Sequence, residues 1–342
     1  MADRFPSINQ TIALVKREDV KFFISLFSEF DDDFYPLIRH AQIPNDILNP
    51  NIPYDFLPET TLKNLIEVLG SRLSVEDFGL LISRACREIY TPRFTSLLTK
   101  RESLKEALEE FSFILRSASS DARVYPKKAG GKWWLVRDKT EADEIWFKYG
   151  EMFAVIFLCE LLKSLTNGKW IPIEIGVQTE YDHEFIRLPE LSKTQFYCSR
   201  PTTALYIPED IIQNPISAPH SQPAAPLSSP IVCDTFLDSF KLAMAPYISM
   251  GKLPIKIASE ILNINVRTIQ RRLKDSGVTY SEVIESMVFS QIIQLLKSDV
   301  LQITEIATKM GYSDSAHFTR AFKRLMHMTP REYKNMLKNK NH

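Results

Sequence analysis

The stretch MGYSDSAHFTRAFKRL, residues Met310–Leu325, decides the fold of the C-terminal part of this chain. It opens with a turn signal at Gly311 and continues without a break into a segment that carries Arg320, Lys323 and Arg324. Phe318 and Phe322 recur four residues apart, which is the spacing of one helical face. The stretch therefore predicts a tight turn followed by a basic, amphipathic helix.

A second segment, 49 residues earlier, repeats this pattern. RTIQRRLK (Arg267–Lys274) and AHFTRAFK (Ala316–Lys323) share the form x-x-Φ-x-R-x-Φ-K, in which Φ is apolar. We expect Asn265 to cap the first helix and Ser313 to cap the second. Each turn follows a short helical pattern, IKIASEIL in one case and ITEIATKM in the other. The repeat predicts two helix-turn-helix motifs.

The helical spacing separates a core face from an outward face in each predicted second helix. Ile269 and Leu273 should face the core in the first motif, and Phe318, Phe322 and Leu325 in the second. The basic face of a single helix of this kind is usually only exposed to solvent. Two matched helices favour a DNA-binding surface instead, because Arg and Gln read base edges while Lys and Thr contact phosphates. The residues predicted to contact DNA are Arg267, Thr268, Gln270, Arg271 and Lys274 in the first motif and Ser315, His317, Thr319, Arg320 and Lys323 in the second.

The segment between the motifs predicts one long connecting helix. YSEVIESMVFSQIIQLLKS, residues Tyr280–Ser298, contains neither Gly nor Pro. At about 1.5 Å per residue it would span roughly 28 Å. Such a rod could hold two recognition helices about one DNA turn, roughly 34 Å, apart.

Residues from about 236 to 340 resemble the DNA-binding domain of the AraC/XylS family of transcription regulators. The resemblance rests on RTIQRRL and on IATKMGYSDSAHFTRAFKRLMHMTPREYK. This chain departs from the family pattern at Val288, where an Arg is usual, and at Asn263 and His327, where a Gly is usual. The resemblance implies an all-α domain that binds double-stranded operator DNA, and contact with RNA polymerase if the protein is an activator.

The N-terminal part resembles the sensor of one branch of this family, labelled "arabinose-binding" and found in regulators of ornithine and arginine utilisation. SLKEALEEF and QFYCSRPTTALYIPEDIIQNPI carry this likeness. It implies a small-molecule effector and a homodimer, and the label does not make arabinose the ligand.

Charge and composition divide the chain in the same way. Residues 233–342 hold 16 Lys and Arg against 10 Asp and Glu, a net charge of +6, so the rest of this neutral chain carries −6. The Pro- and Ser-rich segment 213–231 cannot build a core and is predicted to be a linker. We therefore expect a sensor and dimerisation domain at 1–212 and a DNA-binding domain at 232–342, the basic part of the chain.

The N-terminal domain is predicted to be α+β, because helical and alternating patterns both occur in it. Helices are expected at 59–73 and 103–115, the latter capped by Ser103, and from about Glu141 to Ser164. A hairpin should turn at Gly130-Gly131, and 170–181 and 194–208 alternate like strands. The helix of 141–164 is more apolar than one buried stripe requires, so we expect it to form the dimer interface.

Composition and missing motifs argue against an enzyme, a metal protein or a membrane protein. Four scattered cysteines suggest reduced thiols in a cytoplasmic protein. No cofactor is expected, since the sequence has no GxSxG, HExxH, P-loop or GxGxxG, and His40 and His183 have no second ligand at metal-binding spacing. The N-terminus has no secretory h-region, and the longest apolar run, Met152–Leu162, is too short to span a bilayer.

Three functional hypotheses remain from the sequence. The first is a one-component transcription regulator whose N-terminal domain binds a small molecule, with Trp133 and Trp134 as weak candidates for ligand contact. The second is a ligand-independent regulator whose N-terminal domain serves dimerisation or contacts another protein. The third is a DNA-repair enzyme of the alkyltransferase kind, which would require a reactive cysteine.

Overall fold

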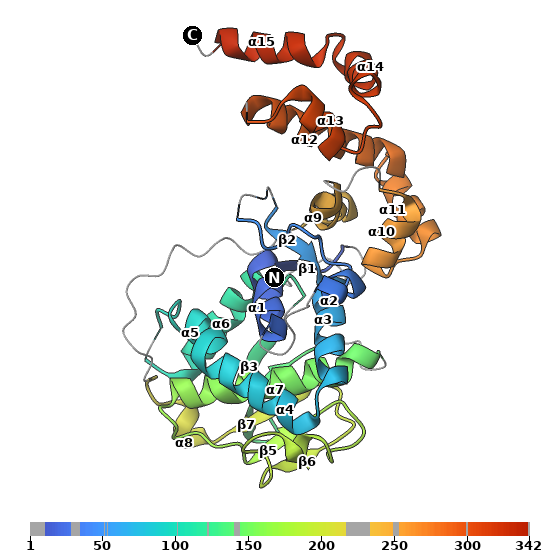
Figure 1. Ribbon diagram of the computed structural model, residues 1–342. Coiled ribbons are helices and arrows are strands. Elements are labelled where there is room, and N and C mark those ends of the chain that lie inside the picture. The colour runs from blue at the N-terminus through green and yellow to red at the C-terminus, as the bar shows by residue number, and fades with distance from the viewer. Residues whose placement is uncertain are drawn as a thin grey trace. The chain divides into compact units, whose positions relative to one another are not determined.

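The computed structural model divides the chain into two compact units. The residues that it describes are 11–28, 35–50, 52, 54–100, 102–121, 123–139, 144–216, 233–248, 253–298 and 300–340. One unit is mixed α/β and the other is helical apart from one short strand, which confirms the predicted fold classes (Figure 1). Most of the predicted linker, residues 217–231, lies outside the described residues.

The mixed unit contains residues 13–48 and the chain from 61 to its last described residue before the linker, 216. The predicted helix of 59–73 is confirmed, and so is the Ser103 cap, whose Oγ accepts a hydrogen bond from Glu106 N at 3.2 Å. The helices of this part are α1 (Arg17–Ser28), α2 (Tyr35–His40), α3 (Glu59–Arg72), α4 (Val75–Ala85), the π-helix η1 (Cys86–Tyr90), α5 (Thr91–Thr95), α6 (Leu104–Ala118), α7 (Ile145–Leu165), the 3-10 helix η2 (Phe185–Arg187) and α8 (Glu209–Ile212).

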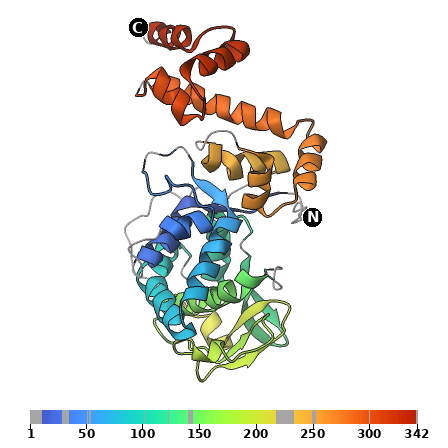
Figure 2. The ribbon, with the colours of Figure 1, turned by 45° about the vertical axis from the view of Figure 1, so that its right-hand side comes forward.

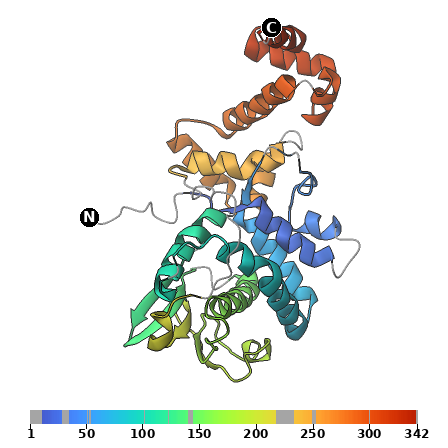
Figure 3. The ribbon, with the colours of Figure 1, turned by 90° about the vertical axis from the view of Figure 1, so that its left-hand side faces the viewer.

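Among the described residues, the main sheet of this unit has five strands in the order β3-β4-β7-β5-β6. Their bounds are β3 (Val124–Ala129), β4 (Lys132–Arg137), β5 (Glu174–Gly176), β6 (Gln195–Tyr197) and β7 (Thr203–Ile207), and a further strand, β1 (Leu14–Lys16), lies outside this sheet. The predicted hairpin is confirmed, because β3 and β4 pair antiparallel (Figure 3). Gly130 and Gly131 form its turn, and both have positive φ. The predicted strand region 170–181 forms only the short strand β5, and the region 194–208 forms two short strands, β6 and β7. Strands β5 and β6 pair in parallel.

Helix α7 is the central element of the mixed unit rather than a surface for a partner. Fifteen of its 21 residues are buried, and the helix contacts α4, α5, η1 and β7. Phe157 packs against Tyr90, Phe94 and Phe111 with ring centroids 4.9 to 6.0 Å apart. Its own chain therefore uses the apolar surface of this helix, and the prediction that it forms the dimer interface is wrong.

The helical unit contains 233–248 and 253–340, but also residues 11–12 and 49–60 from the N-terminal part of the chain. Strand β2 (Phe56–Pro58) packs against the first helix of this unit, and Thr60 Oγ1 donates a hydrogen bond to Ile261 O at 2.6 Å. The sequence prediction had placed this segment in the sensor. The helices are α9 (Phe236–Ile248), α10 (Ile255–Leu262), α11 (Val266–Asp275), α12 (Tyr280–Ser298), α13 (Ile303–Lys309), α14 (Ser315–Met326) and α15 (Pro330–Lys340).

The predicted connecting helix is present as α12, a single helix of 19 residues between the two helical pairs (Figure 2). Its buried side chains Val283, Ile284, Ile292 and Leu296 anchor it within the unit. In the part of the chain that the structure describes, no helix combines the length and the hydropathy that a membrane span requires.

Candidate nucleic-acid interface

The first helix-turn-helix consists of α10 and α11, and its turn depends on two asparagines. Asn263 ends α10 in the left-handed conformation, with φ of +51°, which Asn tolerates better than most residues. Asn265 caps α11 as predicted, because its Oδ1 accepts a hydrogen bond from Arg267 N at 2.9 Å. The left-handed position explains why a Gly is usual there in the family that the sequence resembles.

The predicted faces of α11 are confirmed in the structure. Ile269 and Leu273 are fully buried. Arg267, Gln270, Arg271 and Lys274 are exposed, and Thr268 is half-buried. The neighbouring Arg272 points the other way and lies 5.2 Å from the centre of the Phe236 ring of α9. The helix thus presents three cations and an amide on one exposed stripe.

The second helix-turn-helix consists of α13 and α14, and its cap differs from the prediction. Asp314, not Ser313, caps α14: its Oδ1 accepts a hydrogen bond from His317 N at 2.6 Å. The backbone hydrogen bond from His317 lowers the pKa of the Asp314 carboxyl, so the cap is charged at neutral pH. Ser313 instead donates a hydrogen bond to the Asp314 carboxylate at 3.2 Å. A carboxylate is the better partner for the positive end of a helix.

The core face of α14 is narrower than predicted. Phe318 and Phe322 are buried, and Phe322 also contacts Tyr333 of α15. Leu325 is 40% exposed, so its assignment to the core is wrong. The helix contributes only one turn of aromatic residues to the core, and Leu325 lies three residues after Phe322, beyond the end of that stripe.

The outward residues of α14 differ in how freely they can reach a ligand. Ser315, Arg320 and Lys323 are exposed, while His317 and Thr319 are half-buried. Thr319 Oγ1 donates a hydrogen bond to Ser315 O at 2.7 Å, and the His317 ring contacts Tyr312 with centroids 5.5 Å apart. Of the predicted set on this helix, Arg320 and Lys323 are therefore the cations best placed for DNA.

Helix α14 ends at a second left-handed residue where the related family usually has Gly. His327 has φ of +57°, and its N–H donates to Lys323 O at 2.9 Å. Nearby, Arg324 is held by Glu285 of α12 at 2.6 Å. This ion pair joins α14 to α12.

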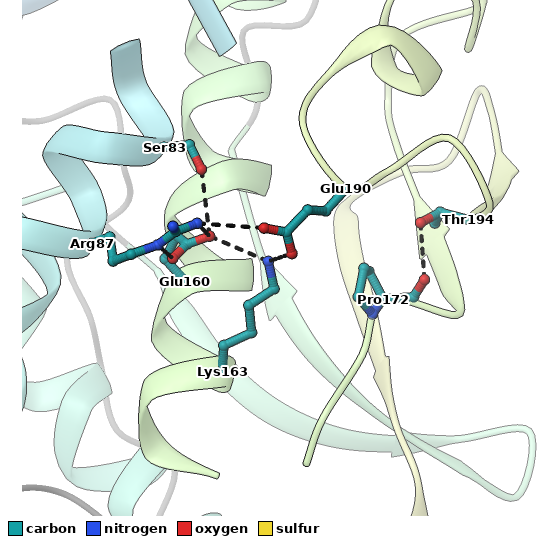
Figure 4. A network of polar contacts seen from close by, with 7 residues as sticks. All are labelled: Ser83, Arg87, Glu160, Lys163, Pro172, Glu190 and Thr194. Carbon is teal, nitrogen blue, oxygen red and sulfur yellow. Dashed lines mark hydrogen bonds and ion pairs between the residues drawn. The ribbon is translucent and has the colours of Figure 1, made fainter. Parts of the chain in front are cut away.

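The mixed unit holds an ion network around the buried Glu160 that could be mistaken for a catalytic centre (Figure 4). Glu160 of α7 accepts hydrogen bonds from Arg87 Nε at 2.9 Å and from Lys163 Nζ at 3.2 Å. Glu190 accepts from Lys163 Nζ at 2.5 Å and from Arg87 Nη2 at 3.4 Å. Two acids face two bases, so the charges balance. The network joins η1, α7 and the loop that contains Glu190, which is a structural role.

The cysteines of this unit do not have the character of nucleophiles. Cys86 and Cys159 are buried, and burial raises the pKa of the Cys159 thiol to about 12. Burial also raises the pKa of Cys86 and Cys198. Since the thiolate is the reactive form, these three cysteines do not suit an alkyl-transferring enzyme. Within the described ranges, no group of His, Cys, Asp and Glu side chains could hold a metal ion.

The structure separates the two tryptophans proposed as ligand contacts, because neighbours on a strand point to opposite faces. Trp134 lines an open pocket of about 490 Å³ on the sheet, together with Tyr197 and Arg200. Trp133 lies on the other face, with Lys128 Nζ 5.6 Å from its ring centre. The remaining pocket residues share no signal in the sequence, because only the strand register brings them together.

Comparison with known proteins places the C-terminal part of the chain in a known class. Residues 258–336 match the family described as "Helix-turn-helix domain". The transcriptional regulator VqsM of Pseudomonas aeruginosa is 32% identical over 77 residues, which cover 22% of this chain and 24% of that protein. The ornithine utilization regulator of the same organism is 31% identical over 85 residues, 25% of each chain. The matches thus span about a quarter of the length of these relatives, and both relatives are described as regulators, not as enzymes.

The transcriptional regulator CdpR of Pseudomonas aeruginosa is similar over more of the chain. The alignment with its crystal structure covers 90% of this chain and 98% of the CdpR chain, with 17% sequence identity and a TM-score of 0.37. The family match, the curated relatives and the paired motifs agree on the C-terminal part of the chain: residues 258–336 form a helix-turn-helix domain, similar in sequence to the corresponding parts of these transcription regulators.

Proposed function

We propose that this chain is a one-component transcription regulator. Its C-terminal domain would bind operator DNA through α11 and α14, and its N-terminal unit would bind a small-molecule effector. The proposal is carried by the two recognition helices, each with buried apolar anchors and an exposed stripe that includes Arg271 or Arg320. The related VqsM and ornithine utilization regulator support the same class of function.

The effector part of the proposal rests on the pocket of the mixed unit. A ligand can shift a regulator between two states only by its differential affinity for them. An open pocket lined by aromatic and charged side chains is a feature of ligand sites. A regulator that binds no ligand would not need this pocket. A surface that contacts another protein could also be hollowed in this way.

We also propose that the protein binds DNA as a homodimer, with a surface other than α7 as the interface. Two chains joined by their N-terminal units gain affinity for paired sites through a raised effective concentration. If the protein activates transcription, RNA polymerase is a further partner.

Substitution of the exposed arginines tests the proposed DNA-binding surface. Arg271→Ala and Arg320→Ala should each weaken specific operator binding by about 1–3 kcal/mol if these side chains read bases. The matched control is Arg272→Ala, which also removes one positive charge from α11 but from the side that packs against Phe236. Fluorescence anisotropy with a selected operator measures specific binding, and the same measurement with a scrambled duplex measures binding that does not depend on sequence.

The outcomes distinguish the possible roles. An equal loss on both duplexes would make Arg271 and Arg320 phosphate contacts, and a lower dependence of affinity on salt would accompany it. If Arg272→Ala weakens binding as much as Arg271→Ala while the fold is intact by circular dichroism, the exposed stripe is not the DNA-binding surface.

A further inference from the structure

The outer face of the five-stranded sheet is shaped as a trough by the residues that its register aligns. One row across the strands pairs Tyr125 with Val136, Val136 with Ala204, Ala204 with Gly176, and Gly176 with Tyr197. The aromatic residues stand at the two ends of this row and the small residues in the middle. A hollow with aromatic walls follows, because cross-strand neighbours on one face stand side by side.

The next row on the same face closes one end of the trough. Trp134 pairs with Tyr206 across β4 and β7, and their rings are 5.7 Å apart. Lys132 Nζ lies 2.6 Å from Glu174 Oε1 and 5.0 Å from the centre of the Tyr206 ring. The acid of the trough is therefore already neutralised by a lysine of the neighbouring part of the sheet.

Two further cations line the same pocket. Lys127 and Arg200 are both exposed, and neither has an acidic partner among the described residues. The Arg200 guanidinium lies 5.4 Å from the centre of the Tyr197 ring. With Glu174 and Lys132 balanced, the pocket carries an excess of two positive charges.

We infer that this pocket binds a planar organic anion, a small molecule with a flat apolar ring and a carboxylate or similar group. The flat part would lie on Val136, Ala204 and Gly176 between the aromatic walls, because aromatic faces favour stacked or edge-on rings. The anionic group would lie toward Lys127 on β3, which supplies a charged hydrogen-bond donor, and Arg200 beside Tyr197 adds a second positive charge at the other end of the row. The inference rests on the proposal that the mixed unit is a sensor.

The charge of the pocket argues against its main alternative, a second copy of the chain. In a two-fold symmetric contact the same surface meets itself. Lys127 and Arg200 of one copy would then face those of the other, and like charges across an interface are unfavourable. An anion satisfies the same side chains.

The test is isothermal titration of the full-length protein with 2-naphthoate and with its neutral counterpart, 2-naphthamide. We expect 2-naphthoate to bind one site per chain with a Kd on the order of 0.1–1 mM, as a ligand of this size allows. The amide should bind at least about threefold more weakly, since it loses the charge interaction. Ala204→Leu fills the middle of the trough without changing a charge and should weaken 2-naphthoate by about tenfold or more.

Lys127 and Lys128 provide a matched pair for the role of charge. They are neighbours on β3, but Lys128 lies on the other face, paired with Glu209 at 2.9 Å. Lys127→Gln should weaken 2-naphthoate about two- to fivefold, the range for an exposed charge pair, and Lys128→Gln should leave the affinity unchanged.

The inference is overturned if 2-naphthoate does not bind, if the amide binds equally well, or if the two lysine variants behave alike. It is also overturned if Ala204→Leu changes the monomer–dimer equilibrium in sedimentation, because the face would then be an interface between copies. None of these outcomes bears on whether Arg271 and Arg320 bind operator DNA. The regulator proposal stands or falls on that separate measurement.

Discussion

At the scale of single residues, Asp19 is the group whose environment most changes its chemistry. It is 2% exposed, and its Oδ1 lies 3.0 Å from Arg93 Nη2. Burial raises the pKa of the Asp19 carboxyl from 3.8 to about 6, and the opposite effect of Arg93 is smaller. The folded protein therefore holds this proton at pH values where the unfolded chain has lost it.

This shift predicts a pH dependence of stability with a definite sign. Between about pH 4 and pH 6 the folded state binds more protons at Asp19 than the unfolded state, so the contribution of Asp19 to the free energy of unfolding falls as pH rises. The full change is about 3 kcal/mol for a shift of this size. The difference between wild type and Asp19→Asn, from urea unfolding followed by tryptophan fluorescence, isolates it. A difference that stays constant or rises across this window contradicts the assignment.

At the scale of secondary-structure elements, one carboxylate caps a helix and another joins a helix to the sheet. Asp314 starts α14, and Glu151 joins α7 to the loop after β5 and to β7. Glu151 is fully buried and accepts hydrogen bonds from Gln178 N at 2.7 Å and Thr179 N at 3.1 Å. The hydroxyls of Thr179 and Thr203 complete its partners.

Glu151→Gln should destabilise the mixed unit by about 2–3 kcal/mol. Each carboxylate oxygen accepts from one backbone N–H, and an amide has only one oxygen, so one buried donor would face the NH₂ group unpaired. All four tryptophans of the chain lie in this unit, at positions 133, 134, 146 and 170. Urea unfolding followed by tryptophan fluorescence therefore reports on it. An unchanged midpoint would show that water or a rearranged loop replaces the lost acceptor.

Asp314→Ala should loosen α14 by about 1 kcal/mol, the usual effect of losing a helix cap. Ser313→Ala is the matched control and should have a much smaller effect, since the Ser313 hydroxyl contacts the side chains of Asp314 and His317 rather than a backbone N–H at the start of the helix. Hydrogen exchange of the amides in 315–326 measures both. If the amides of 315–326 are equally protected in the two variants, Asp314 is not the residue that caps α14.

At the scale of the whole molecule, the N-terminal unit is expected to join two chains on DNA. The full-length protein should bind an operator with two sites far more tightly than residues 233–342 alone, and one site only slightly more tightly. Gel-shift titrations of both proteins on one-site and two-site DNA measure this. If both gain equally from the second site, the N-terminal unit is not the dimerisation module.

This comparison needs a control for folding, because the isolated fragment lacks residues 11–12 and 49–60 of the same unit. In the full chain β2 of that segment packs against α9, and Ile12 N donates a hydrogen bond to Ser239 Oγ at 2.9 Å. Circular dichroism of the fragment separates lost structure from lost pairing. Adding a peptide of residues 49–60 in trans tests whether the segment restores thermal stability.

The sequence by itself determined the C-terminal domain. Helix, turn and helix are local structures, and their signals lie within a few residues of one another: the periodic Ile269 and Leu273, the Asn265 cap and the uninterrupted stretch of 280–298. The exposed stripe followed from the same periodicity. Two local details were wrong, the cap and Leu325, because a neighbouring acid competes with Ser313 and the core ends after Phe322.

Only the tertiary structure decided the rest, because it depends on contacts between residues far apart in the chain. The apolar surface of α7 could have faced a partner or its own core, and packing by α4, α5 and β7 decided for the core. The segment 49–60 joined the C-terminal unit through contacts with residues about 200 positions away, such as Thr60 with Ile261. The trough arises from strand register alone: Tyr125, Ala204 and Tyr197 carry no shared local signal, and pairing across β3 to β6 is what sets them side by side.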